Sequence, residues 1–267
     1  MKKTLTTIGI WLGAQITVTV IFMIAALIMK MDMTAILAPS LLVSDFLVIV
    51  LLLILKYCGL KELFKGVPVD ILLISIVFAL SGMFAVDILA TSVEIPNILE
   101  EQFQAMAGTV TGFLGICIIG PIMEEMMMRR VILKEMEKLT KSMWWGIIIS
   151  SALFAIVHIN PIQVVFAMPA GIFLGWLYCK TGSLLVPICI HIINNTISFI
   201  VMSVGSDTEI GMDSTFGKIM LIAFIAVSVA TYFWLRAKLR SQKIEEATVE
   251  PAQATDKEAS EENNNEE

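Results

Sequence analysis

The sequence predicts an all-α, polytopic membrane protein of about eight transmembrane helices. Hydrophobic residues make up 57% of the 267-residue chain and charged residues only 16%, whereas soluble domains carry about 25% charged residues. The apolar residues gather in recurring runs, and several approach the roughly 20 residues that a helix needs to cross a bilayer. The basic residues are concentrated in alternate connections between these runs, which is the asymmetry typical of multi-pass membrane proteins.

Eight apolar runs are the candidate spans. In chain order they are Thr6–Met29, Leu41–Tyr57, Val69–Ala90, Ala107–Leu133, Trp144–Ile159, Ile162–Cys179, Leu184–Val204 and Phe216–Leu235. The first run follows two lysines as in a signal peptide, but it is too long for a cleaved segment, so we expect it to be retained. The fourth run is overlong and contains charges. Only Asn160-Pro161 separates the fifth run from the sixth, which predicts a tight turn.

The charge distribution predicts the orientation of these spans. Of the 18 Lys and Arg residues, only Lys30 and Lys218 fall on the outer side when the N-terminus is placed inside. The positive-inside rule therefore predicts that both termini are cytoplasmic. Segment 95–106 is amphipathic, and we expect it to lie on the outer membrane surface.

The end of the chain has a different composition from the rest. Residues 241–267 contain nine acidic residues and two lysines, and such a segment cannot bury a core. We therefore predict a membrane domain over residues 1–240 and a disordered, acidic, cytoplasmic tail over residues 241–267. The tail accounts for the net charge of −6, and nothing in the chain predicts a nucleic-acid partner.

Ionisable side chains inside three of the spans are the candidate functional residues. A charge in hydrocarbon costs at least about 2.5 kcal/mol, so its presence indicates function by default. The fourth span carries Glu124, Glu125 and Arg129, the fifth carries Phe154 and His158, and the seventh carries His191, Asn194 and Asn195. Asp45, Asp70 and Asp87 lie nearer the ends of their spans, and we expect them at the membrane interface.

Helical spacing separates the roles of these residues. Glu125 and Arg129 are four residues apart and can form an ion pair. Glu124 points about 100° away from Glu125, which leaves its carboxylate free. At 1.5 Å per residue, Glu124, the two histidines and Asn195 all lie about 14–21 Å from the inner side. This convergence predicts one polar site that opens toward the cytoplasm.

The chemistry of this site has two interpretations. A carboxylate beside a histidine can deprotonate a water molecule, and a second histidine with an asparagine can donate hydrogen bonds to an oxyanion. Alternatively, Glu124, His158 and His191 could ligate zinc and leave a fourth position open. Spacing alone does not distinguish the two.

The three motifs resemble those of the CPBP family, which groups CAAX prenyl proteases with bacteriocin-processing and bacteriocin-immunity proteins of the Abi group. The family pattern is EExxxR, FxxxH and HxxxN. It reads here as Glu124-Glu125-MMM-Arg129, Phe154-AIV-His158 and His191-IIN-Asn195. The resemblance covers about residues 120–198, and Arg130 departs from the glycine that is common after the motif arginine.

The resemblance implies an intramembrane endopeptidase of a bacterial plasma membrane. By analogy, Glu124 would activate water with help from His158, while His191 and Asn195 would form the oxyanion hole. Glu125 and Arg129 would position the site, with Phe154 packed beside His158. A metal-free glutamate mechanism is favoured over zinc, because asparagine is a poor zinc ligand and a good oxyanion donor.

The expected partners are the lipid bilayer and a peptide or membrane-protein substrate, such as a leader peptide, rather than a prenylated protein. Two other functions fit the sequence. One is a non-catalytic bacteriocin self-immunity protein. The other is a proton-coupled transporter in which Glu124, His158 and His191 form a relay, although the chain lacks the internal repeats of many transporters.

Overall fold

The computed structural model describes residues 1–204 and 211–264, with side chains described as far as Gln242. Its elements are α1 (Lys2–Met29), the 3-10 helix η1 (Met33–Ile36), α2 (Leu37–Ile54), α3 (Leu60–Leu63), α4 (Val69–Ala90), α5 (Glu100–Met106), α6 (Val110–Phe113), the π-helix η2 (Leu114–Ile119), α7 (Gly120–Glu125), the π-helix η3 (Met126–Leu133), α8 (Lys134–Thr140), α9 (Met143–Ile156), α10 (Pro161–Thr181), α11 (Leu185–Val204) and α12 (Thr215–Asn264). The all-α prediction is confirmed.

Seven helical stretches of the described chain are long and apolar enough to cross a membrane. They are Lys2–Met29, Met33–Ile54, Val69–Ala90, Val110–Thr140, Pro161–Thr181, Leu185–Val204 and Thr215–Gln242. The predicted polytopic membrane protein is therefore confirmed, but one of the eight predicted spans is shorter than expected. Run 144–159 forms α9, which has 14 residues and rises about 21 Å, less than the roughly 30 Å of a hydrocarbon core.

The second span starts earlier than the apolar run suggests. Its helical stretch begins at Met33, because Asp32 caps η1 by accepting a hydrogen bond from the Thr34 amide at 2.8 Å. Pro39 falls within the first turn of α2, where its missing N–H has no intrahelical partner to lose. Because polar residues and a proline occur near the start of the helix, the hydropathy pattern placed the start of this span about two turns too late.

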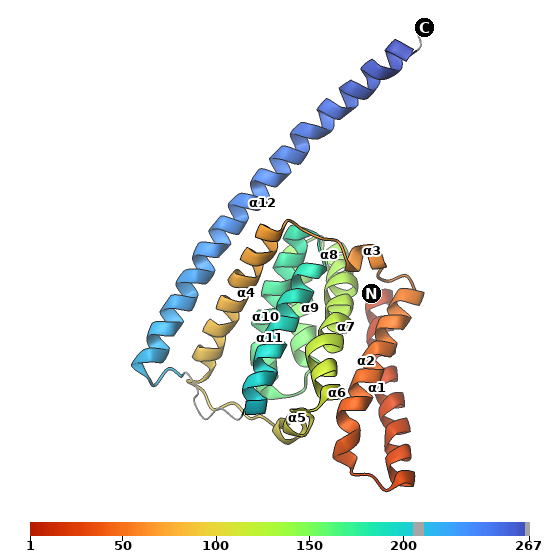
Figure 1. The fold of residues 1–267 in the computed structure, drawn as a ribbon, viewed down its shortest axis with the longest axis vertical. Coiled ribbons are helices and arrows are strands. Elements are labelled where there is room, and N and C mark those ends of the chain that lie inside the picture. The colour runs from red at the N-terminus through yellow and green to blue at the C-terminus, as the bar shows by residue number, and fades with distance from the viewer. Residues whose placement is uncertain (205–210, 265–267) are drawn as a thin grey trace.

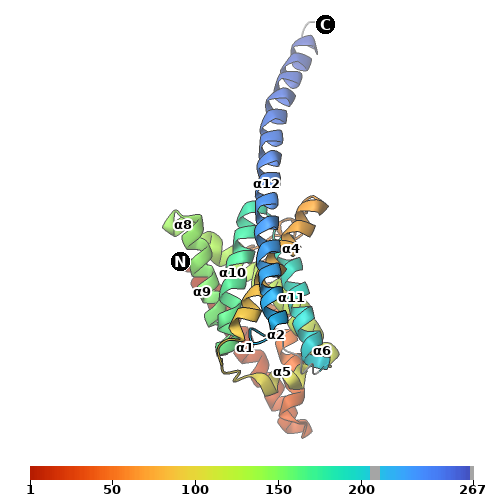
Figure 2. The same cartoon turned by 90° about the vertical axis from the view of Figure 1, so that its left-hand side faces the viewer.

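The helices are arranged with α1 and α2 on one side and α4 and α12 on the other (Figure 1). Between these pairs lie α7, α9, α10 and α11, so the motif-bearing elements occupy the middle of the bundle (Figure 1). Figure 2, in which α12 faces the viewer, shows α9 to its left and α11 to its right. The ribbon of α12 continues past the bundle to Asn264. Because the side chains beyond Gln242 lie outside the described residues, the disordered tail over 241–267 stays a prediction.

Aromatic packing joins α4, α10 and α12 into one wall. The ring of Phe78 packs edge-on against Phe173 and Trp176, with centroids 5.3 and 5.5 Å apart. The ring of Tyr232 in α12 packs at a tilt against Trp176, with centroids 5.3 Å apart. A Cβ on Gly82 would come within 2.4 Å of the Phe173 ring, so the absence of a side chain there is what lets α4 and α10 approach. These contacts hold α10 against α4 and α12, and α9 packs on α10.

Helix α9 is held on both of its sides. Ser150 donates a hydrogen bond to the Met128 carbonyl of η3 at 2.9 Å. On the α10 side, a Cβ on Gly171 would meet the Ser151 side chain at 2.8 Å. These contacts bring the end of α9, and therefore Phe154 and His158, beside the glutamates of α7.

Candidate active site

The two glutamates lie in a short α-helical segment between two π-helical turns. Helix α7 ends at Glu125, with η2 before it and η3 after it. Each π turn changes the angular register of the side chains around the helix, and such turns occur frequently at functional sites. Neither turn was predicted from the sequence, although Pro121 at the start of α7 is a signal, because proline clashes with the carbonyl four residues before it.

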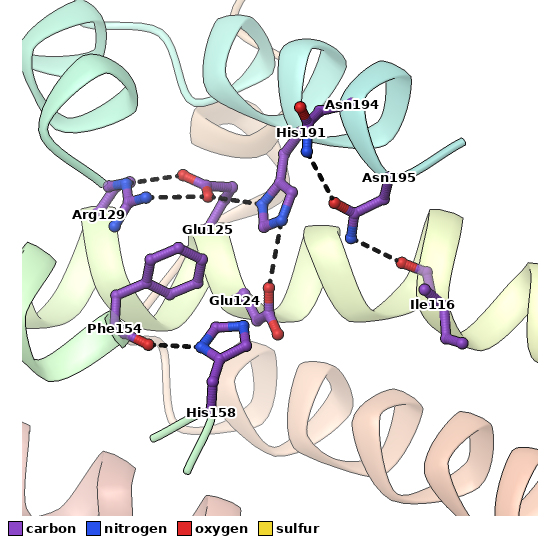
Figure 3. Close-up of polar contacts among 9 residues, drawn as sticks. All are labelled: Ile116, Glu124, Glu125, Arg129, Phe154, His158, His191, Asn194 and Asn195. Atoms are coloured by element: carbon purple, nitrogen blue, oxygen red, sulfur yellow. Dashed lines mark hydrogen bonds and ion pairs between the residues drawn. The ribbon is translucent and has the colours of Figure 1, made fainter. Parts of the chain in front are cut away.

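Pro121 also explains where Asn195 lies. In η2 the Gly120 amide donates a hydrogen bond to the Gly115 carbonyl, five residues earlier. If this pattern continued, the amide of residue 121 would donate to the Ile116 carbonyl. That residue is Pro121, which has no N–H, and a buried carbonyl left without a partner is costly. Asn195 of α11 supplies the missing donor, with its Nδ2 3.0 Å from the Ile116 carbonyl oxygen (Figure 3).

Glu125 and Arg129 form the ion pair that their spacing predicted. Arg129 Nε lies 2.9 Å from Glu125 Oε2, and both side chains are fully buried. The guanidinium also lies over the ring of Phe154, 4.9 Å from its centroid. This pair neutralises two charges that would otherwise be buried alone.

His191 stands between the two glutamates. Its Nδ1 lies 3.0 Å from Glu125 Oε1 and its Nε2 lies 3.5 Å from Glu124 Oε2. His191 is 7% exposed, and its ring packs perpendicular to Phe154, with centroids 5.7 Å apart. Since each ring nitrogen faces a carboxylate, the imidazole is oriented from both ends (Figure 3).

Glu124 is the accessible carboxylate of the pair. Its side chain is 25% exposed, whereas that of Glu125 is 0% exposed. In Figure 3 its carboxylate lies between His191 and His158. The sequence prediction that Glu124 is left free while Glu125 is paired with Arg129 agrees with this geometry.

The place of His158 in the apolar run predicted that it lies within a helix. In the structure it lies in a turn instead. Helix α9 ends at Ile156, and His158 Nδ1 lies 2.7 Å from the Phe154 carbonyl oxygen. A carbonyl only accepts, so Nδ1 carries the hydrogen and Nε2 of the neutral ring is an acceptor. This second nitrogen points toward Glu124 (Figure 3). The ring packs perpendicular to Phe154 at 4.9 Å.

The turn that carries His158 has a strained backbone and is held in place by side-chain hydrogen bonds. Ile159 has a φ of 61°, a left-handed conformation that costs roughly 1–2 kcal/mol for a residue with a side chain. The next residue, Asn160, is 1% exposed and is anchored to the segment before α5. Its Nδ2 donates to Asn97 Oδ1 at 2.8 Å, and its Oδ1 accepts from the Ile98 amide at 3.1 Å.

Asn194 contacts its neighbour Asn195. Its Nδ2 lies 3.4 Å from Asn195 Oδ1, so it supports Asn195 and does not reach the glutamates (Figure 3). Asn195 uses one amide hydrogen for Ile116 and keeps the second. The structure thus brings together Glu124, Glu125, Arg129, Phe154, His158 and His191, with Asn195 one turn farther along α11.

A zinc centre does not fit the donor set seen here. In the described part of the chain, no three His, Cys, Asp or Glu side chains are grouped so that they could hold a metal ion. No metal ion is therefore part of the mechanism proposed below.

Two residues near the site were misjudged or missed in the sequence. Asp45 was expected at the membrane interface, but it lies within α2 and is 2% exposed. It accepts a hydrogen bond from Gln15 Nε2 of α1 at 2.7 Å. The available signal was a carboxylate in an otherwise apolar run, and its distance from the motifs along the chain concealed its position. Asn160 was read only as a turn former.

Comparisons with known proteins agree with the motif region. Residues 106–197 match the Rce1-like family, described as type II CAAX prenyl endopeptidase Rce1-like. The chain is also 29% identical over 162 residues to the "Putative membrane peptidase YdiL" of Bacillus subtilis (strain 168). That alignment covers 55% of this chain and 64% of the relative. No solved structure matches the chain.

The matched segment contains all of α7, α9 and α10 and the part of α11 that carries His191 and Asn195. These are the elements that converge on the two glutamates. In residues 106–197, this multi-pass membrane protein is therefore similar to the Rce1-like family of type II CAAX prenyl endopeptidases.

Proposed function

We propose that the protein is an intramembrane endopeptidase in which Glu124 activates the attacking water. The observation that carries this proposal is the accessible Glu124 carboxylate, 3.5 Å from His191 and next to His158 (Figure 3). The buried Glu125–Arg129 ion pair beside it supplies a fixed frame. The whole-protein activity is a proposal here, since the alignment spans less than two thirds of the curated relative.

The first step is proton transfer from water. Glu124 accepts a proton from a water molecule held between its carboxylate and His158 Nε2, and the water oxygen attacks the peptide carbonyl carbon. The carbonyl oxygen becomes an oxyanion. The second amide hydrogen of Asn195 and a hydrogen on His191 Nε2 are the donors that would stabilise this charge.

The second step breaks the peptide bond. Protonated Glu124 gives its proton to the departing nitrogen, the C–N bond cleaves, and a carboxylate and an amine are released. Glu125 keeps the imidazole aimed through its 3.0 Å contact with Nδ1.

The substrates we propose are membrane-associated peptides, such as leader peptides or fragments of membrane proteins. The catalytic unit would be residues 1–240, in a bacterial plasma membrane. The similarity of residues 106–197 to the Rce1-like family supports a peptide substrate. The position of the glutamates within an apolar bundle supports a substrate that reaches the site from the membrane or its surface.

The test is cleavage of a panel of fluorogenic peptides by purified protein in detergent. Wild type is expected to cleave at least one peptide, and Glu124→Gln should lose at least about a hundredfold in kcat, the range of general-base catalysis. Activity should survive a zinc chelator. A Glu124→Gln protein as active as wild type would refute the catalytic role, and a wild type that protects cells from a bacteriocin without cleaving any peptide would favour an immunity function.

A further inference from the structure

Asp45 is a buried carboxyl group on α2, outside the segment that matches the family. It is 2% exposed, and its described hydrogen-bond partner is the neutral carboxamide of Gln15. None of the described residues forms an ion pair with it. A carboxyl group inside a membrane bundle without a cation is costly when charged, and it is retained where it has a function.

The second oxygen of Asp45 faces the helix that carries Glu124. A Cβ built on Gly120 would lie 3.5 Å from Asp45 Oδ2, so the bare backbone of Gly120 gives Asp45 access to α7. Glu124 follows Gly120 by four residues and lies on the same face. Helical side chains lean toward the N-terminus, which directs Glu124 toward Gly120 and Asp45.

Two carboxyl groups that face one another in a site of low dielectric do not both ionise readily. Glu124 is the more accessible one and has His191 beside it, so it is the group that holds the charge. Asp45 is the more buried and has a neutral donor. Because Gln15 donates to Oδ1, the hydrogen of the neutral acid belongs on Oδ2, the oxygen that faces Gly120 and α7.

We propose that Asp45 is a positioning residue that, as a neutral carboxylic acid, donates a hydrogen bond that orients the Glu124 carboxylate from the side of α2. Gln15 orients Asp45 in turn. The role of Asp45 in catalysis rests on the proposed function, whereas its protonation and its contact with Glu124 do not. The inference extends the site to the first two helices, which carry none of the three motifs.

The kinetic test compares two substitutions at Asp45. Asp45→Asn keeps both an acceptor for Gln15 and a donor for Glu124, and its kcat should stay within about threefold of wild type. Asp45→Leu removes both, and its kcat should fall about tenfold or more with little change in KM, as expected when a reacting group is misaligned. Asp87→Leu is the matched control, since Asp87 is a half-buried carboxyl on α4, and it should keep the wild-type kcat.

Three kinetic outcomes would overturn the proposal. The first is an Asp45→Leu protein with the wild-type kcat. The second is an Asp45→Asn protein as impaired as Asp45→Leu, because that would require a charge at this position. If Asp45→Leu does not fold, Gln15→Leu takes its place. That variant should lower kcat several-fold, and an unchanged kcat is the third overturning outcome.

A spectroscopic readout needs no substrate and therefore separates this inference from the proposed function. The infrared spectrum should contain the carbonyl band of a protonated carboxyl group that disappears in Asp45→Asn and shifts in Glu124→Gln. A spectrum in which Asp45→Asn changes no such band would overturn the inference even in an active protease. The expected band changes in a protein that cleaves no peptide would support the Asp45 contact while the proposed function fails.

Discussion

Adjacent glutamates with opposite surroundings define the chemistry at the scale of single residues. Glu125 is fully buried and bonded to Arg129 and His191, whereas Glu124 keeps a quarter of its side chain exposed. The difference arises because consecutive helical residues point about 100° apart. One glutamate therefore serves the fold, and the other is available for a reactant.

We predict that substitutions at the two glutamates will have separable effects. Glu125→Leu or Arg129→Leu alone leaves a buried, unpaired charge and should cost about 3–5 kcal/mol of stability. The double substitution should cost much less than the sum of the two. Glu124→Gln should change stability by less than about 1 kcal/mol, since Glu124 is partly exposed and has a long contact with His191.

Thermal unfolding in detergent measures all four variants on one scale. The neighbouring Glu124→Gln is the matched control, because it changes the same residue type one position away. Equal destabilisation by Glu124→Gln and Glu125→Leu would contradict the division of roles between the two residues.

At the scale of elements, the π turn η2 and α11 are linked by one hydrogen bond. Asn195 satisfies the Ile116 carbonyl, which Pro121 cannot serve. Asn195→Leu should therefore cost about 1–3 kcal/mol, the penalty for a buried group left without a partner. Adding Pro121→Ala supplies the missing amide and should restore much of that loss. The measurement is a double-mutant cycle by thermal unfolding, and strictly additive effects would rule out the link.

The turn between α9 and α10 is the second element on which the site depends. Asn160→Ala removes both side-chain bonds to the segment before α5, so His158 should lose its position and kcat should fall about tenfold or more. Asn97→Ala removes only one of these bonds and should have a smaller effect. Ile159→Gly relieves the left-handed strain without altering Asn160 and should keep the wild-type kcat. Peptide cleavage measures the kcat of all three variants. A fully active Asn160→Ala protein would show that the hydrogen bonds of Asn160 are not needed to position His158.

Much of the element layout could be predicted from the sequence, because lipid demands long apolar runs. The Glu125–Arg129 pair followed from a spacing of four residues, since the side chains lie on one continuous helix. The turn at His158 could not be predicted in this way, because the apolar run continues to Ile159 while the helix stops at Ile156. Asp45 was misjudged since its partners, Gln15 and the backbone near Gly120, are distant in sequence.

At the scale of the whole molecule, contacts between distant segments divide the connections into two groups. At one end, Met1 bonds to Glu135, Glu62 to Arg130, Ser183 to the Lys65 carbonyl, and Lys238 to Asp70. At the other end, Asn97 bonds to Asn160, and the Thr91 hydroxyl accepts from the Met212 amide. These are the same two sets of connections that the distribution of basic residues assigned to the inner and outer sides.

This division bears on whether the short helix α9 crosses the membrane. Seven crossings would place the termini on opposite sides, whereas eight place them together. Met1 and Lys238 both lie at the end of the bundle that carries Arg130 and Lys65. We therefore predict that α9 acts as an eighth crossing despite its length, with the bilayer thinned beside it or neighbouring helices covering the shortfall.

Reporter fusions measure this directly. A green fluorescent protein at either terminus should fluoresce, and alkaline phosphatase at the same positions should be inactive, because both termini are expected in the cytoplasm. Phosphatase inserted after Asp213 should be active, since this connection lies at the opposite end. If the N-terminal and C-terminal fusions gave opposite results, α9 would be a re-entrant segment. His158 would then lie at the tip of that segment, and the route of a peptide to Glu124 would have to be sought on the outer side.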